Sequence, residues 1–318
     1  MIISASYKTD IPTFYGKWFM NRLEEGFCYM VNPYNRRAYK VDLGPESVDA
    51  FVFWTKNIGP FMPMLKQVNN LKYPFMVQYT INGYPRSLET SVVNPERSIQ
   101  QLKEISEKYG SRVAVWRYDP IVFTSETPLD FHRRQFEALA KQLEGYTDEV
   151  VVSFAHLYKK TKSNLERAAR ENKFELEDLN DAEKVNLARE FWHMADSKNI
   201  KLTICSQDEY LSEGIEATKC VDAERLSDIA KRPFNTKLKG NRTDCGCYES
   251  RDIGEYDTCP HGCVYCYAVR SQDIAKSRYR DHDPESPFLF RPDGEIKMPE
   301  GPLTTPNQEG LQIPLILS

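Results

Sequence analysis

The sequence of 318 residues contains no long hydrophobic run and carries little net charge. No stretch approaches the roughly 18 uninterrupted apolar residues that a membrane-spanning helix requires. The N-terminus, MIISASYKTD, lacks the basic start and the apolar run of a secretory signal, so we expect a cytoplasmic protein that does not enter a membrane. The 42 Lys and Arg residues nearly balance the 46 Asp and Glu residues, and the net charge of −4 provides no electrostatic footprint for duplex DNA.

Internal repeats and a Gly-rich phosphate-binding turn are also missing. The missing phosphate-binding turn disfavours an open, doubly wound nucleotide-binding sheet, which is the alternative to a parallel barrel. The sequence contains instead a series of largely apolar, β-forming runs, as expected for parallel strands that are covered on both faces. The predicted strands are 1–6, 48–54, 74–81, 112–118, 149–154 and 200–205.

Helical patterns fill the intervals between these runs. Asn94 and Pro95 provide an N-cap followed by proline at the first helical position, and Gly145 provides a C-cap. Strand starts lie on the order of 40 residues apart, the size of a βα unit. The pattern therefore predicts an α/β fold, a partial or complete parallel (β/α) TIM-like barrel. The predicted helices are 14–25, 95–109, 129–143 and 181–197.

The alternating pattern stops at about residue 235, so we assign the barrel to 1–235. Residues 236–275 are rich in cysteine and are expected to form an extension that binds an iron–sulfur cluster. Residues 276–318 are expected to form an extended tail, because 283–318 contains seven of the nineteen prolines. The apolar end of the tail, LQIPLILS, is a segment that can dock on the body.

The eight cysteines are unevenly placed. Cys28 and Cys205 stand apart among apolar neighbours and are expected to be buried small hydrophobes. The other six lie close together, and in a reducing compartment such clustering indicates metal binding rather than disulfides. These six are Cys220, Cys245, Cys247, Cys259, Cys263 and Cys266.

The most informative motif is Cys259-Pro-His-Gly-Cys263-Val-Tyr-Cys266. Three thiolates at this spacing can ligate three irons of a cubane cluster and leave the fourth iron without a ligand from the motif. A structural zinc site, the alternative, usually shows two pairs of the C-x2-C kind. His261, inside the motif, is expected to be a solvated loop residue rather than a ligand.

With Tyr265 as its aromatic residue, this motif resembles the cluster motif of the radical S-adenosylmethionine (radical SAM) superfamily, and CPHGCVYCYA is similar to the version in photoproduct-lyase-like members. The resemblance implies a 4Fe–4S cluster on Cys259, Cys263 and Cys266. It also implies S-adenosylmethionine at the open iron with Tyr265 on its adenine side, reductive cleavage to a 5′-deoxyadenosyl radical, and a barrel fold. An electron donor such as a flavodoxin or ferredoxin would be a partner.

The chain departs from the superfamily in the place of the motif. In the superfamily the motif follows the first strand, whereas here it follows the sixth predicted strand. The chain as a whole resembles an uncharacterised bacterial family of unknown function with the same C-terminal cysteine cluster, over roughly residues 1 to 290. The strings that carry this resemblance are SASYKTDIP, VFWTKN, WRYDP and DIGEYDTCPHGCVYCYA. A relocated motif would work if its loop folds back to the carboxyl ends of the strands, where barrel enzymes keep their sites.

Polar residues follow several of the predicted strands and form a candidate pocket. Lys56 and Arg117 can hold a carboxylate or phosphate, and Asp119 can orient Arg117 or bind a ribose hydroxyl. These three are the candidate catalytic residues, while Gln78 and Ser153 join Tyr265 as candidate cofactor-binding residues. The alternatives are a structural ion pair between Arg117 and Asp119 and a solvated loop position for Lys56.

The remaining clustered cysteines, Cys220, Cys245 and Cys247, are candidates for auxiliary metal binding. They can hold a second cluster or zinc, supply a fourth ligand to the first cluster, or be structural. A fourth ligand would block chelation of S-adenosylmethionine and favour a role in electron transfer or structure.

The leading hypothesis is therefore a radical SAM-type enzyme that acts on an unknown small-molecule substrate. One alternative is a non-catalytic metal-binding or redox-sensing protein. Another is a photoproduct-lyase-like enzyme of nucleic acid, which the net charge disfavours because phosphate contacts need Lys and Arg. A basic stretch precedes the motif, and its simplest interpretation is a solvated linker. This stretch comprises Lys231, Arg232, Lys237, Lys239 and Arg242.

Overall fold

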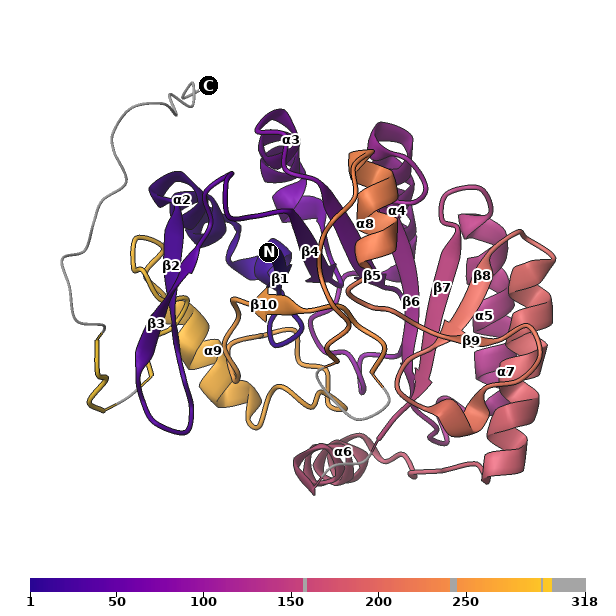
Figure 1. Ribbon diagram of the computed structural model, residues 1–318. Coiled ribbons are helices and arrows are strands. Elements are labelled where there is room, and N and C mark those ends of the chain that lie inside the picture. Colours follow the sequence, from indigo (N-terminus) through magenta and orange to yellow (C-terminus); the bar gives the residue numbers. More distant parts are fainter. Residues whose placement is uncertain (157–158, 241–244, 293, 299–318) are drawn as a thin grey trace.

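The computed structural model describes residues 1–156, 159–240, 245–292 and 294–298, and an eight-stranded parallel sheet forms its centre (Figure 1). The strand order is β10-β1-β4-β5-β6-β7-β8-β9, and each neighbouring pair is parallel. The strands are β1 (Ile2–Ala5), β4 (Ala50–Thr55), β5 (Phe75–Thr80), β6 (Ala114–Ile121), β7 (Glu149–Phe154), β8 (Lys201–Ile204), β9 (Glu216–Ala217) and β10 (Ser250–Asp252).

The strands follow one another across the sheet in chain order except for β10, which returns to pair with β1. The predicted α/β class and the parallel sheet are confirmed, and the six predicted strands are β1 and β4 to β8. A closed barrel is not seen, because in the described part of the chain the edge strands β9 and β10 are not paired with each other. A separate antiparallel hairpin, absent from the prediction, contains β2 (Phe27–Val31) and β3 (Ala38–Asp42).

Local capping explains where the helices begin. Asn94 accepts a hydrogen bond from the amide of Arg97 at the start of α4, and Asn180 forms a capping box with Glu183 at the start of α7. The predicted helix 14–25 is divided, because Tyr15 leaves the helical conformation between α1 and α2. The helices are α1 (Ile11–Phe14), α2 (Gly16–Glu25), α3 (Met62–Asn70), α4 (Pro95–Tyr109), α5 (Leu129–Leu143), α6 (Lys159–Asn172), α7 (Asp181–Asp196), α8 (Ala223–Ala230) and α9 (Gln272–Arg280), with short 3-10 turns at Gly59–Phe61 and Asp208–Tyr210.

Both faces of the sheet are buried, which explains why its strands read as apolar runs. We call the face covered by α5 and α7 the outer face and the face covered by α8 the inner face. On the outer face, helices supply aromatic side chains, and Phe136 of α5 stacks on Phe191 of α7 at 4.1 Å between ring centroids. On the inner face, a second apolar cluster combines alternate strand residues with the segment around α8. Its members include Ile2, Val52, Met76, Val115, Val151, Cys220, Leu226 and Cys247.

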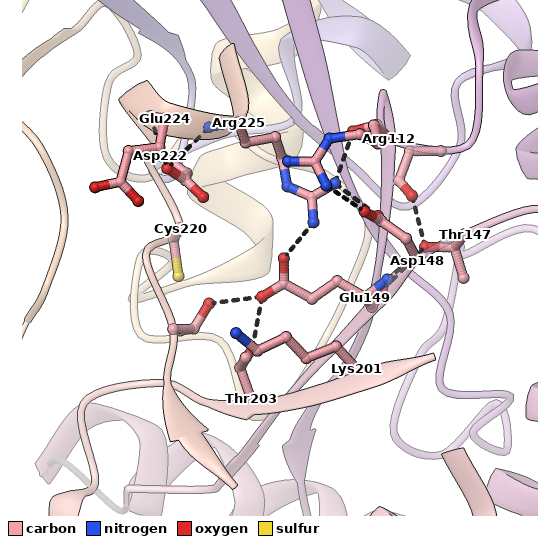
Figure 2. A network of polar contacts seen from close by, with 12 residues as sticks. Arg112, Thr147, Asp148, Glu149, Lys201, Thr203, Cys220, Asp222, Glu224 and Arg225 are labelled. Atoms are coloured by element: carbon pink, nitrogen blue, oxygen red, sulfur yellow. Dashed lines mark hydrogen bonds and ion pairs between the residues drawn. The ribbon is translucent and has the colours of Figure 1, made fainter. Parts of the chain in front are cut away.

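A buried arginine fixes α8 over the inner face (Figure 2). Arg225 donates to Asp148 at 2.7 Å and to Glu149 at 2.6 Å, both at the start of β7, and to the backbone oxygen of Arg112 at 2.8 Å. Glu149 also accepts from the hydroxyl of Thr203 at 2.7 Å. The Arg225 side chain is only 5% exposed, so water screens these ion pairs little. The network thereby holds the chain that directly follows Cys220.

The segment after α9 packs against the hairpin and α2. Trp18 donates its indole N–H to the carbonyl of Ser286 at 2.9 Å, and Phe288 stacks on Tyr29. The terminal string LQIPLILS lies outside the described residues. Among the residues that the structure describes, no helix has both the length and the apolar character needed to cross a membrane.

The Arg225 network predicts unequal costs for two arginine substitutions. Arg225→Met leaves two carboxylates without their buried cation and should lower the free energy of unfolding by about 3–5 kcal/mol. Arg112→Met is the matched control, since the Arg112 side chain is 48% exposed, and it should cost about 0–1 kcal/mol. Urea unfolding followed by circular dichroism measures both. Equal costs would contradict a structural role for the Arg225 network.

Candidate functional site

The motif loop lies against the segment that follows β5. Cys263 forms an antiparallel bridge with Glu89. The amide of Ser91 donates to the carbonyl of His261 at 2.9 Å, and that of Val264 donates to the carbonyl of Leu88 at 3.0 Å. Because residues 85–92 follow the carboxyl end of β5, these backbone contacts place the motif at the carboxyl edge of the sheet.

The three motif thiols form one electrostatic group. Cys259 interacts with Cys266, and Cys263 interacts with both. Burial raises the pKa of the Cys259 and Cys263 thiols well above the usual range, although the nearby Lys56 ammonium lowers that of Cys263. All eight cysteines are described and none forms a disulfide. No group of three or more Cys, His, Asp or Glu side chains in the described residues is arranged to hold a metal ion as it stands, so metal ligation stays a prediction.

A buried polar triad stands beside Cys263. The Lys56 ammonium lies 2.8 Å from Glu89 Oε1, and the hydroxyl of Tyr265 donates to the same oxygen. Burial lowers the pKa of Lys56, but Glu89 and Cys263 raise it more, and the net direction is upward. The Lys56 side chain is 14% exposed and paired with Glu89, so it is not the solvated loop residue that was the alternative. Asn82 donates to the Tyr265 hydroxyl at 3.3 Å and extends the triad.

His261 is buried, which corrects the expectation that it is solvated. Its Nε2 lies 2.7 Å from Asp10 Oδ2, its ring packs edge-on against Phe14, and the residue is 3% exposed. Asp10 Oδ2 also accepts from the backbone amide of Lys56 at 2.8 Å and the hydroxyl of Thr55 at 3.0 Å. Asp10 stands among the polar residues at the end of the first predicted strand, but the sequence alone assigns it no role.

Arg117 and Asp119 form the ion pair that was the alternative to a ligand-binding role. Two guanidinium nitrogens donate to the two carboxylate oxygens at 2.9 and 2.5 Å, and the side chains are 6% and 12% exposed. Arg117 Nη1 donates to Gln78 Oε1 at 3.0 Å and to Cys220 Sγ at 3.2 Å. Gln78 itself donates to the Cys220 carbonyl at 2.8 Å, and Ser153 donates to Asp119 at 3.4 Å. The fold thus brings Arg117, Asp119, Gln78 and Ser153 together in one hydrogen-bonded group.

A second group of thiols contains four cysteines. Cys220 Sγ lies 3.5 Å from Cys205 Sγ, and Cys247 interacts electrostatically with both Cys220 and Cys245. Cys205 was expected to be an isolated hydrophobe, and this contact corrects that interpretation. Its position directly after β8 is the signal that could have found it, since the carboxyl ends of parallel strands share one edge.

A pocket opens next to the triad. Asn82 and Glu89 line it together with Tyr84 and Arg86, which come from the same loop after β5. Three buried polar atoms near the motif have no hydrogen-bond partner in the described structure: Thr9 Oγ1, Asn82 Oδ1 and His261 Nδ1. A polar ligand at this edge would meet unsatisfied groups on both sides of the motif.

The fold and this site define an α/β protein with a parallel sheet and a three-cysteine loop at the carboxyl edge of its strands. The chain belongs to the family described as Domain of unknown function (DUF1848), whose model matches residues 2–268. The expected membership of a family of unknown function is thereby confirmed, and the match includes all three motif cysteines. A comparison with curated proteins gives no match.

Gly262 is required by the backbone of the motif loop. It has a φ of +77°, and a Cβ placed there would lie 2.8 Å from the Cβ of Thr90. Gly262→Ala should therefore combine the left-handed penalty of about 1–2 kcal/mol with an overpacking cost of about 1–3 kcal/mol. Gly110→Ala is the control, because Gly110 has a φ of +97° but meets no atom within 4 Å. Urea unfolding should show the larger loss for Gly262→Ala; equal losses would mean that Thr90 moves aside.

Proposed function

We propose that this protein is an iron–sulfur enzyme of the radical SAM type. Cys259, Cys263 and Cys266 hold a 4Fe–4S cluster at the carboxyl edge of a partial (β/α) barrel, in a reducing cytoplasmic environment. The observation that carries the proposal is the position of the motif loop, whose backbone bonds to the segment after β5, next to a polar triad and a pocket.

The residues present fit such a group. The donor set is three thiols, the ligands that iron–sulfur clusters use, and the Lys56 cation beside Cys263 favours its thiolate. The unpartnered Asn82 Oδ1 can accept a hydrogen bond from an amino group or from the adenine amine. Tyr265 and the pocket after β5 would hold the adenine side of S-adenosylmethionine. When bound, the cluster would supply the electron that cleaves S-adenosylmethionine, taken from a flavodoxin- or ferredoxin-like donor.

The protein's own side chains position this site and shield it from water. Glu89 fixes both the Lys56 ammonium and the Tyr265 hydroxyl, and its own exposure is 4%. Asp10 holds His261 between the first two motif cysteines. A dry surrounding of this kind strengthens the attraction between Lys56 and a bound anion.

A nucleic-acid substrate is less favoured, because acidic partners neutralise much of the basic stretch before the motif. Lys237 and Lys239 pair with Glu249, and Arg232 pairs with Asp49. Arg242 lies outside the described residues. Paired surface cations of this kind offer little net charge to a phosphate backbone.

Anaerobic reconstitution with iron and sulfide tests the proposal. The reconstituted protein should show a reduced-cluster electron paramagnetic resonance signal that changes when S-adenosylmethionine is added, and dithionite should yield 5′-deoxyadenosine. Cys263→Ser should abolish the product, whereas Cys28→Ala, which removes a thiol buried in the hairpin, should preserve it.

Two results would contradict the enzymatic proposal. A cluster whose resonance signal ignores S-adenosylmethionine, and which yields no 5′-deoxyadenosine, would indicate a structural or redox-sensing role. Zinc in place of iron after anaerobic purification, lost in the variant Cys263→Ser, would indicate a structural zinc site in the motif.

A further inference from the structure

The four thiols outside the motif meet on the inner face of the sheet. Cys220 and Cys247 are each 4% exposed and pack within the inner apolar cluster, which Cys205 and Cys245 also contact. We propose that Cys205, Cys220, Cys245 and Cys247 bind one metal ion in a tetrahedral thiolate site, separate from the motif. Zn²⁺ is the expected ion, with iron as the other ion that this donor set accepts.

The spacing of the sulfurs favours a single ion. Zn–S bonds of about 2.3 Å place the sulfurs of a tetrahedral site about 3.8 Å apart. Cys205 Sγ and Cys220 Sγ are 3.5 Å apart, close to this value. Cysteines that ligate different irons of a cubane cluster are held farther apart by the cluster between them.

Two donors already point at the sulfurs. The amide of Val221 donates to Cys247 Sγ at 3.3 Å, and Arg117 Nη1 donates to Cys220 Sγ at 3.2 Å. Four thiolates around a divalent ion carry a net charge of −2, which the guanidinium of Arg117 would partly offset. Hydrogen bonds of this kind orient metal ligands and stabilise their anionic form.

The ligands come from segments next to both edges of the open sheet. Cys205 directly follows β8, Cys220 follows the edge strand β9, and Cys245 and Cys247 precede the opposite edge strand β10. A backbone hydrogen bond already joins two of these segments, since the amide of Tyr248 donates to the carbonyl of Val221 at 3.0 Å. An ion on the four thiols would thus link the two edges that strand pairing leaves apart.

In the described structure the four thiols do not surround one point: Cys205 Sγ lies against Cys220 Sγ, and Cys245 and Cys247 belong to the same apolar cluster. Each Cys side chain has one rotatable torsion before its sulfur, and the proposal requires rotation about these torsions to bring the four sulfurs around one point. Binding releases the thiol protons, because the thiolate is the ligand.

The test uses the full-length variant Cys259→Ser/Cys263→Ser/Cys266→Ser, which lacks the motif thiols, reduced and freed of metal under argon. Titration with Co²⁺ should saturate at one equivalent with thiolate-to-cobalt charge transfer and the intense visible bands of a tetrahedral ion, and Zn²⁺ should displace it. Adding Cys205→Ser should weaken Co²⁺ binding by at least about tenfold. Adding Cys28→Ser instead should leave binding unchanged. Since this background cannot hold the proposed motif cluster, its outcome is independent of the radical SAM proposal.

Absence of tetrahedral cobalt bands in folded protein would overturn the inference, and so would binding that ignores Cys205→Ser. A second measurement on the unaltered chain covers the case in which a variant fails to fold. Alkylation of the cysteines, mapped by mass spectrometry, should slow at all four proposed ligands together when Zn²⁺ is present. Protection confined to Cys259, Cys263 and Cys266 would overturn the inferred four-cysteine site.

Discussion

One buried carboxylate, that of Asp10, joins three parts of the chain at the carboxyl edge of the sheet. Its Oδ1 accepts from the amide of Thr13 and so begins α1, while its Oδ2 accepts from Thr55 and Lys56 at the end of β4. The same Oδ2 lies 2.7 Å from His261 of the motif loop. A residue near the N-terminus thereby contacts a loop 251 residues later, and this contact joins the motif loop to the ends of β1 and β4.

A continuous polar path runs between the two groups of cysteines. Asn82 donates both to the Tyr265 hydroxyl, beside the motif, and to the carbonyl of Asp119 at 3.4 Å. Asp119 in turn holds Arg117, which reaches Cys220. Arg117 and Asp119 thus act within the protein, as a bridge from the strand ends to the inner face. An ion on the second group of thiols would stiffen this bridge and, through Asn82, the wall of the pocket.

The parts of the fold that were predictable are those whose cause is local. Apolar runs predicted the six central strands, and Asn94 with Pro95 predicted the start of α4. β10 was missed because Ser250–Asp252 has no apolar residue; its pairing with β1 makes it a strand. The surroundings of His261 and Cys205 were predicted wrongly for a related reason. Their partners, Asp10 and Cys220, come close to them only in the folded chain. Glu89 belongs to no motif in the sequence. Only its contacts with Lys56 and Tyr265 in the structure show that it is part of the site.

The return of β10 also bears on the unusual place of the motif. The motif follows β10, a strand that the sequence did not reveal, rather than directly following the sixth predicted strand. In space β10 is the first strand of the sheet, in the order β10-β1-β4. In the radical SAM superfamily that the motif resembles, the cluster loop follows the first strand. A loop that comes late in the chain therefore leaves the sheet next to β1, the first strand in chain order, because β10 pairs with β1.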